Sequence, residues 1–430
     1  MIRRNTIAVL LFGIIFFSCN KDSNVGSPSV QIITPASQAI YNVHDTVWVS
    51  AKVSDDNGLN TVSVYLINNL GTQVLPNAVV KITSKSFTFK IAYVLSDIHL
   101  ISGQYSIVVF ASNGTNSTYA YQQISVDATP TKREAIYAIT KSGSGVHVSK
   151  IDSVFNVSLA YTNPGDYSSS DVNSYYQQLY VTASDTGSVN ANSVPGGSNA
   201  WSVPGIISSP VYFTNTYSSG DAVYISFYNG YVRYYNSLGV LQSVFSIEAN
   251  YYPIKTYAYS NYLFVEEKAI SSKTTNLVVF YSATTASMQQ ALLPGPVTAM
   301  FDMDNDHIMV FGNDYTGVPY MLQYSISNNI FFSPITLPAA TLLSAEQVDA
   351  NTYLMGYSNG NIYQYTYNPN VMNTFAGGVM ASHIRYDVVN NQVIVATAHY
   401  IKEYNYVSGA LVNTADLIDS VLNVHILNNK

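Results

Sequence analysis

Short segments in which apolar and polar residues alternate fill most of the chain, and turns rich in Gly, Asn, Asp and Ser separate them. The alternation at Val49, Ala51 and Val53 is the period of a β-strand with one buried face. About seven such strands within about 100 residues are typical of a β-sandwich, which we expect at residues 30–127. Its predicted strands are Val30–Thr34, Thr46–Val53, Thr61–Ile67, Ser86–Tyr93, Gln104–Ala111 and Tyr119–Ser125.

The region after residue 135 contains an internal repeat. Each unit has a short apolar strand followed by a second and a third strand, and a further strand precedes it. Four antiparallel strands per unit of roughly 43 residues predict a β-propeller with seven blades. The seven repeated strands, which start 43, 44, 39, 45, 46 and 40 residues apart, are Ile136–Thr140, Leu179–Ala183, Val223–Phe227, Tyr262–Glu266, His307–Phe311, Tyr353–Tyr357 and Val393–Thr397.

The first and last units of the repeat complement each other. The first unit has no inner strand, because the polar, Pro-containing segment 128–134 precedes it, and we interpret that segment as a linker. Ser420–Leu427 is one apolar strand more than the last unit needs. Pairing this strand with the first unit would close the ring and remove open sheet edges. The predicted fold is therefore all-β, with a sandwich followed by a seven-bladed propeller at 135–430 that the C-terminal strand closes.

Two motifs resemble known families. The segment Ser54–Leu59, which reads Ser-Asp-Asp-Asn-Gly-Leu, together with Val62–Tyr65 resembles the region between strands B and C of bacterial immunoglobulin-like domains. The repeat, an apolar strand and then Tyr, a polar residue and a turn, resembles quinoprotein-like and YVTN propellers more than the WD-repeat type. The tryptophans that dock blades in quinoprotein dehydrogenases are missing, since Trp201 is the only one in this region. We therefore expect neither a quinone nor another cofactor.

The N-terminal segment is typical of a secretory signal. Arg3 and Arg4 precede an apolar run from Ile7 to Phe17, which is too short to span a bilayer. Ser18 and Cys19 follow, and Cys19 is the only cysteine in the sequence. This combination resembles the lipobox of bacterial lipoproteins, in which the cysteine becomes lipidated. A plain signal peptide with an incidental cysteine is the alternative.

The lipobox implies a signal peptide at residues 1–18 and a lipidated cysteine with a polar tether at 19–29. Lys21 and Asp22 resemble a shortened surface-export signal of Bacteroidota lipoproteins. A tether of this kind lets a folded domain stand away from a membrane. We therefore expect an outer-membrane location, with the cell surface favoured over the periplasmic face.

Composition narrows the classes of partner. Only 10% of the residues are charged, whereas average soluble domains carry about a quarter, and 37 Tyr and 17 Phe favour strands. The formal net charge of −7 argues against nucleic acid, because binding to phosphates needs concentrated Lys and Arg. The oligomeric state stays open.

Ionisable residues give little sign of catalysis. The acids after residue 135 are thinly spread, and the five His residues fall in separate units, so we expect no convergent cluster. The sequence contains no metal pair, nucleophile motif or phosphate-binding loop. The alternating acids Asp302, Asp304 and Asp306 are weak candidates for calcium ligands. A solvated hairpin turn is the interpretation that we favour for them.

Aromatic and amide side chains are predicted to gather at one rim of the propeller. The loops between the first and second strands of each repeat and the loops from one unit to the next both lie at this rim. Flat rings stack on the C–H faces of sugars, and the same residue types occur in protein-binding surfaces. The alternative is that these are ordinary strand tyrosines at an exposed edge. The candidate ligand-binding residues are Tyr228, Asn229, Tyr251, Tyr252, Asn313, Tyr315, Tyr357, Asn359, His399 and Tyr400.

These features predict a lipid-anchored envelope protein whose propeller recognises a glycan or protein ligand without catalysis. A structural docking component of an outer-membrane complex is one alternative. An enzyme acting on polysaccharide is another, and it would need two carboxylates, or a carboxylate and a histidine, close together in the central channel.

Overall fold

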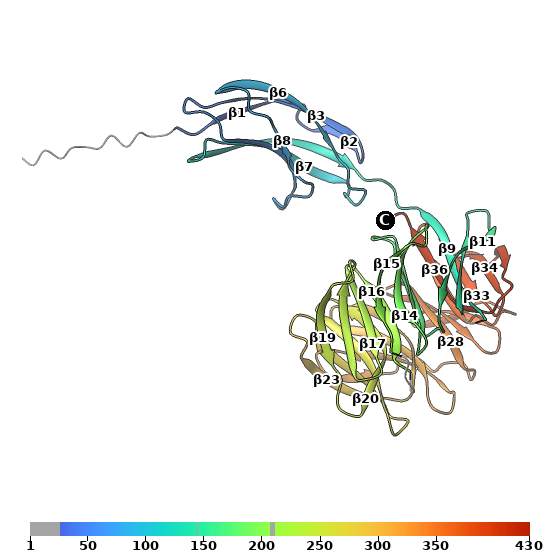
Figure 1. The fold of residues 1–430 in the computed structure, drawn as a ribbon. Coiled ribbons are helices and arrows are strands. Elements are labelled where there is room, and N and C mark those ends of the chain that lie inside the picture. The colour runs from blue at the N-terminus through green and yellow to red at the C-terminus, as the bar shows by residue number, and fades with distance from the viewer. Residues whose placement is uncertain (1–25, 144, 207–210) are drawn as a thin grey trace, which may run out of the picture. The chain divides into compact units, whose positions relative to one another are not determined.

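A computed structural model describes residues 26–143, 145–206 and 211–430 of the chain. Within these residues the regular structure consists of β-strands alone, which confirms the all-β prediction, and no helix there is long and apolar enough to cross a membrane. The chain divides into two compact units, and the boundary falls between Pro130 and Thr131 (Figure 1). Cys19, the predicted lipidation site, lies outside the described residues.

The first unit is a two-sheet sandwich. One sheet has the order β1-β3-β6 and the other has the order β2-β8-β7-β4-β5, in which β2 runs parallel to β8. Alternate residues of β3 and β4, among them Val49 and Val64, are fully buried between the two sheets. The strands are β1 (Ser29–Thr34), β2 (Ala39–Asn42), β3 (Thr46–Ser54), β4 (Thr61–Asn68), β5 (Ala78–Val79), β6 (Ser86–Val94), β7 (Gly103–Ser112) and β8 (Ser117–Asp127).

The turn that carries the immunoglobulin-like motif is held by its own acid. Asp55 Oδ1 accepts a hydrogen bond of 2.7 Å from the backbone amide of Asn57, and Asp55 Oδ2 accepts one of 2.8 Å from Asn113. The side chain thus fixes the connection between the two sheets.

The described part of the second unit contains seven antiparallel sheets of four strands each. Each sheet is formed from consecutive strands, except the sheet β11-β10-β9-β36. The strands of that sheet are β9 (Arg133–Ser142), β10 (Gly145–Ile151), β11 (Val157–Pro164) and β36 (Val421–Asn428). The next three sheets are β12 (Ser169–Asn173), β13 (Gln178–Thr182), β14 (Ser188–Ser193) and β15 (Asn199–Pro204); β16 (Phe213–Ser219), β17 (Ala222–Phe227), β18 (Tyr231–Asn236) and β19 (Leu241–Ser246); and β20 (Tyr251–Tyr259), β21 (Tyr262–Ala269), β22 (Thr275–Tyr281) and β23 (Ser287–Leu293).

The remaining three sheets follow in the same way. They are β24 (Val297–Asp304), β25 (His307–Asn313), β26 (Pro319–Ser325) and β27 (Ile330–Phe332); β28 (Leu342–Asp349), β29 (Thr352–Tyr357), β30 (Ile362–Thr366) and β31 (Val371–Ala376); and β32 (His383–Asp387), β33 (Gln392–Ala396), β34 (Tyr400–Asn405) and β35 (Leu411–Asp416).

One edge strand of every sheet lies beside the corresponding strand of the next sheet. We call these seven the inner strands, and they are β12, β16, β20, β24, β28, β32 and β36. β36 also lies beside β12, so the series of inner strands returns to its start. β36 pairs with β9 in the register Val424↔Ala138. β9 begins at Arg133, so the last two residues of the expected linker 128–134 belong to this strand.

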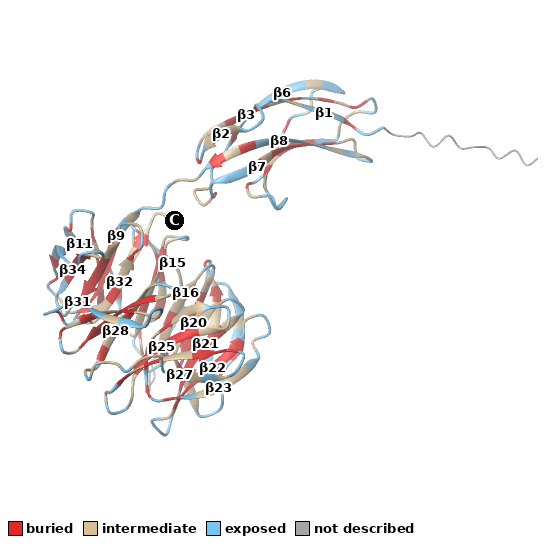
Figure 2. Cartoon of the chain, turned by 180° about the vertical axis from the view of Figure 1, so that it is seen from behind, coloured by how far each residue is buried: buried red, intermediate tan, exposed pale blue. Residues whose placement is uncertain are grey.

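Tyrosine rings fill the spaces between neighbouring sheets. Tyr235, Tyr324, Tyr365 and Tyr404, which end the second strands of their repeats, are all buried, whereas Tyr281 is exposed. Figure 2 shows buried positions along the strands and mainly exposed positions in the connecting loops. The abundance of Tyr therefore reflects packing between sheets at least as much as any binding surface.

Candidate binding cavity

The inner strands surround a cavity of about 700 Å³. Residues from all seven of these strands, or directly beside them, line it. The volume falls within the range of roughly 300–1,000 Å³ that is usual for small-molecule sites.

A common register places the side chains around this cavity. Each inner strand has a buried residue at one equivalent position, and the residue that follows it faces the opposite side because strand residues alternate. The buried residues, of which the first five also line the cavity, are Ser170, Thr216, Thr256, Met300, Ala345, Ile384 and Val424. Six of the residues that follow them line the cavity, namely Asp171, Tyr217, Tyr257, Phe301, Glu346 and Arg385.

Three consecutive inner strands contribute aromatic rings to the wall, and the next two contribute an ion pair. Tyr217, Tyr257 and Phe301 come from three consecutive inner strands, and the rings of Tyr217 and Tyr257 have centroids 5.7 Å apart. Glu346 and Arg385 come from the next two inner strands. Such a cavity offers an apolar face and hydrogen-bonding groups to the same ligand.

Glu346 and Arg385 form the ion pair of this wall. Arg385 Nη1 lies 3.5 Å from Glu346 Oε2, and Arg385 Nη2 donates to Asn423 Oδ1 at 3.2 Å. Burial raises the pKa of Glu346, and the neighbouring guanidinium opposes that shift. The distance is longer than the 2.7–2.9 Å of a strong charge-assisted bond, so Arg385 is only partly neutralised.

Asp171 also lines the cavity, and both of its carboxylate oxygens have partners. Oδ2 accepts a hydrogen bond of 2.6 Å from the amide of Ser218, and Oδ1 accepts one of 2.8 Å from the amide of Val172. Burial raises the pKa of Asp171 to about 6, although these amides and Arg385 favour the ionised form. The carboxyl therefore titrates near neutral pH.

The side chains of three cavity residues accept hydrogen bonds from backbone amides of the neighbouring sheet. Asp171 Oδ2 accepts from the amide of Ser218, Tyr257 Oη accepts from the amide of Asp302 at 2.8 Å, and Glu346 Oε1 accepts from the amide of Tyr386 at 3.1 Å. In each case the residue that donates its amide comes directly after a cavity-lining residue in the sequence of the neighbouring inner strand. These side chains thus satisfy backbone groups at sheet edges and hold the wall in place.

Lys255 and His383 bring two more nitrogen groups into the cavity. Lys255 Nζ donates a hydrogen bond of 2.6 Å to the carbonyl oxygen of Thr298 on the next inner strand. Burial lowers the pKa of Lys255, and burial together with Arg385 and Lys255 lowers the pKa of His383 to about 3. His383 is therefore neutral at physiological pH, while Lys255 and Arg385 are close enough to repel each other.

Part of the predicted rim does come together. Tyr228 and Tyr252 have ring centroids 4.4 Å apart, and Tyr228 and Tyr315 both contribute to the raised pKa of Tyr252, whose main cause is burial. The exposed Asn229 follows Tyr228 in its turn, and the half-buried Tyr251 precedes Tyr252 in β20. The aromatic group thus spans three neighbouring sheets.

The other predicted rim residues lie elsewhere or have structural partners. Tyr357 is fully buried in a core cluster and its hydroxyl faces Met355 Sδ at 3.7 Å, so its assignment to the rim is corrected. Asn313 both donates to and accepts from the backbone of Leu342. The remaining three are exposed and belong to two other sheets. Asn359 and His399 lie in turns, and Tyr400 is the first residue of β34.

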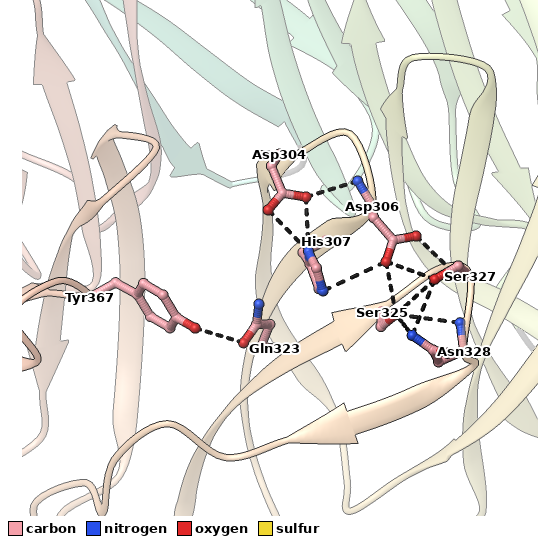
Figure 3. Close-up of polar contacts among 8 residues, drawn as sticks. All are labelled: Asp304, Asp306, His307, Gln323, Ser325, Ser327, Asn328 and Tyr367. Carbon is pink, nitrogen blue, oxygen red and sulfur yellow. Dashed lines mark hydrogen bonds and ion pairs between the residues drawn. The ribbon is translucent and has the colours of Figure 1, made fainter.

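The acidic hairpin between β24 and β25 is held by its own contacts (Figure 3). Asp304 Oδ1 accepts from the amide of Asp306 at 2.8 Å and lies 2.9 Å from His307 Nδ1. Asp306 accepts from Ser325 and Ser327, each at 2.9 Å. Asp302 belongs to a different group of contacts, because its Oδ1 accepts from Tyr257 at 2.5 Å. Within the described ranges, no three His, Cys, Asp or Glu residues are grouped as metal ligands.

The acidic pair Glu266 and Glu267 is buried, with the two side chains facing opposite ways, as strand alternation requires. Glu266 Oε1 accepts from the amide of Val297 at 3.0 Å. Glu267 Oε1 accepts from Asn276 at 3.0 Å and from Gln290 at 2.6 Å. Burial raises the pKa of Glu266 to about 7.

The sequence did not single out the cavity residues. Asp171, Glu346 and His383 line one cavity, which corrects the expectation that ionisable groups do not converge. The signal of Asp171 and Glu346 was positional, because they share one register position with Arg385 in the strands that precede the repeats. His383 lies two residues before Arg385 and does not share that position.

Comparisons with known proteins identify a sequence family for the first unit alone. A comparison with curated protein sequences found no match. Among solved structures, one chain titled Kuenenia stuttgartiensis hydrazine synthase is similar with a TM-score of 0.50 and 9% identity, covering 68% of this chain and 98% of that one. The WD40 β-propeller domain of Doa1 has a TM-score of 0.49 and 9% identity, covering 61% and 85%. The computationally designed Ika8 protein has a TM-score of 0.47 and 16% identity, covering 67% and 89%.

At such identities the likeness to hydrazine synthase concerns the fold alone. The sequence of residues 28–122 matches the bacterial Ig domain family. This match agrees with the two-sheet sandwich of β1–β8 and with the motif at Ser54–Leu59. Residues 28–122 are therefore a bacterial Ig-like domain.

Proposed function

We propose that this chain is a lipid-anchored cell-envelope protein that binds a glycan without catalysis. In this proposal the second unit is a seven-bladed β-propeller that β36 closes, and the Ig-like domain is a spacer. The observation that carries the proposal is the cavity of about 700 Å³ with its aromatic rings and its ionic groups. Sugars present apolar C–H faces and hydroxyl groups together, so both kinds of side chain have a partner on the ligand.

Binding to an array of immobilised glycans tests this function. The full chain in detergent should bind at least one glycan, and Tyr217→Ala should reduce that binding at least tenfold because it removes a stacking ring. Tyr217→Phe keeps the ring and should bind like the natural chain. Absence of binding to every glycan, or full binding by Tyr217→Ala, would overturn the proposal. A stoichiometric protein partner recovered from solubilised membranes would favour a docking component instead.

The location is tested separately through Cys19. Lipidation would attach the chain to the membrane, so Cys19→Ala should move it to the soluble fraction and abolish incorporation of labelled fatty acid. Protease treatment of whole cells would then distinguish the outer face, which we favour, from the periplasmic face. A Cys19→Ala chain that stays membrane-bound would contradict the lipid anchor.

A polysaccharide-acting enzyme is the second candidate, because Asp171 and Glu346 share the cavity and the pKa of Asp171 is raised by burial to about 6. We favour binding without catalysis over an enzyme, because the oxygens of both carboxylates are already engaged by backbone amides or Arg385. New chain ends released from a bound polysaccharide, and lost in Asp171→Asn, would establish the enzyme.

A further inference from the structure

Lys255 brings a positive charge into the cavity. Within the described residues no carboxylate lies in ion-pair distance of its Nζ, and one of its three N–H donors is used by the carbonyl oxygen of Thr298. Glu266 stands opposite Lys255 in the β20–β21 pair, and its charge favours the ionised form of Lys255. Glu266 Oε1 accepts from the amide of Val297, and its Oε2 is buried without a hydrogen-bond partner. The two remaining N–H groups of Lys255 make no hydrogen bond to a described residue.

The cavity also holds two carboxylates and two further nitrogen groups. The carboxylate oxygens of Asp171 and Glu346 already face backbone amides or Arg385. Arg385 lines the same cavity and is only partly neutralised by Glu346 at 3.5 Å. His383 also lines the cavity and contacts Ser382 Oγ through Nδ1 at 3.3 Å. Lys255 and Arg385 disfavour each other's charge, as the lowered pKa of Lys255 reflects after the larger effect of burial. An anion bound between them would relieve this repulsion.

The aromatic rings limit what kind of anion fits. Tyr257 lies two residues after Lys255 on the same strand, and the ring of Tyr217 lies 5.7 Å from that of Tyr257. A small inorganic anion would make no use of these rings, which also pack against Tyr224 and Phe264. A sugar that carries an acidic group can contact the rings and the cations together.

We propose that the cavity binds a carboxylate-bearing sugar, with the carboxylate on Lys255 and Arg385 and the sugar ring against Tyr217 and Tyr257. This inference rests on the proposed glycan binding and names the class of glycan. Arg385 presents a planar fork that matches the two oxygens of a carboxylate.

Matched pairs of glycans test the proposal. The full chain in detergent is titrated calorimetrically with uronate-containing oligosaccharides and with the same oligosaccharides after chemical reduction of their carboxyl groups. We expect the acidic member to bind at least tenfold more tightly and its affinity to fall as NaCl is raised. Equal affinity for both members would overturn the carboxylate assignment while leaving glycan binding intact. Failure of every acidic and neutral glycan to bind would overturn the proposed function itself.

Variants of Lys255 provide the residue-level test. Lys255→Met should lower the affinity for acidic glycans at least tenfold and leave the affinity for the carboxyl-reduced glycans unchanged. Lys255→Arg should retain most of the affinity for acidic glycans. Lys141→Met removes a charge from an exposed position of the same unit and serves as the control. Thermal melting checks that each variant is folded. Unchanged acidic affinity in folded Lys255→Met, or binding of sulfated but not carboxylated sugars, would contradict the proposal.

Discussion

Arg133 at the start of β9 donates a hydrogen bond of 2.9 Å from Nη1 to Asp387 Oδ2 at the end of β32. The same nitrogen lies 2.7 Å from Glu403 Oε1, and the side chains of Asp387 and Glu403 are 1% and 5% exposed. The guanidinium therefore bridges two buried carboxylates and joins the first strand of the second unit to the sheet β32–β35.

Replacing Arg133 should destabilise this unit strongly. Arg133→Met leaves two buried carboxylates without their cation, and we expect the free energy of unfolding to fall by about 3–5 kcal/mol. Lys132→Met is the matched control, because its ion pair with Glu134 is exposed and should contribute less than about 1 kcal/mol. Urea unfolding of both variants measures the difference, and equal effects would contradict a structural role for the buried pair.

The pairing of β36 with β9 can be locked covalently. Ala138 and Val424 are paired directly, so Ala138→Cys with Val424→Cys in a Cys19→Ser background should form a disulfide. The thermal midpoint should rise when the bond forms, because it constrains the unfolded chain. Mass spectrometry under non-reducing conditions detects it. The control has cysteines at Ala138 and Asn423, which are one residue out of register and should stay reduced. A disulfide in this control, with none between positions 138 and 424, would show a different register.

Tyr357 should behave as a core residue. Tyr357→Ala creates a cavity among buried side chains, and we expect a loss of about 3–5 kcal/mol of stability. Tyr357→Phe should cost little, because the hydroxyl contacts only a thioether at 3.7 Å among the described atoms. Calorimetric melting of both, with the exposed Tyr315→Ala for comparison, checks this expectation. A large loss in Tyr315→Ala would mean that the rim also has a structural role.

Glu266 should make stability fall as the pH rises. Burial raises the pKa of this carboxyl from 4.5 to about 7, against the opposing effects of the Val297 amide and Lys255. Between these two pH values the folded chain holds a proton that the unfolded chain has lost, so stability declines as the pH rises through about 7. Relative to Glu266→Gln, the natural chain should lose about 3 kcal/mol between pH 4.5 and pH 8.

Denaturation at a series of pH values measures this difference between the two chains. Glu248→Gln, at an exposed position, should follow the natural chain. Parallel pH profiles for Glu266→Gln and the natural chain would show that Glu266 is ionised in the folded state.

Calcium should leave the acidic hairpin unaffected. Asp304 and Asp306 already accept hydrogen bonds within the turn, and Asp302 is engaged by Tyr257. The thermal midpoint should therefore be the same in 1 mM CaCl₂ and in EDTA. A site with a dissociation constant of about 10 μM would stabilise the chain by about 2.7 kcal/mol under these conditions, so an increase in the midpoint would reveal one.

The local pattern of apolar and polar residues predicted the positions of the long, regular strands. The predicted strand Ser86–Tyr93 matches β6, and Ile136–Thr140 lies within β9. β2 escaped notice because it has four residues and pairs in parallel with β8. β27 has only three residues and ends at Phe332, shortly before Pro334, which has no amide hydrogen to donate to a sheet.

The cavity was harder to predict than the strands. The six cavity residues at the common register position are spread between Asp171 and Arg385, one on each inner strand except β36, so no local motif unites them. Tyr357 was misassigned because the following Ser-Asn-Gly resembles a rim turn, although alternation from Met355 places both residues in a core. Which strand face looks inward is decided by packing between sheets, and that information is not local in sequence.

During synthesis, β9 leaves the ribosome long before the strand that covers its inner edge, because β36 comprises Val421–Asn428. A chain that stops anywhere before residue 421 keeps that edge open to other strands. Its sheet stays incomplete, and its unpaired backbone groups are accessible to chaperones and proteases. The order of strands therefore works as a check on completeness, since only a chain that extends through β36 can pair both sides of β9.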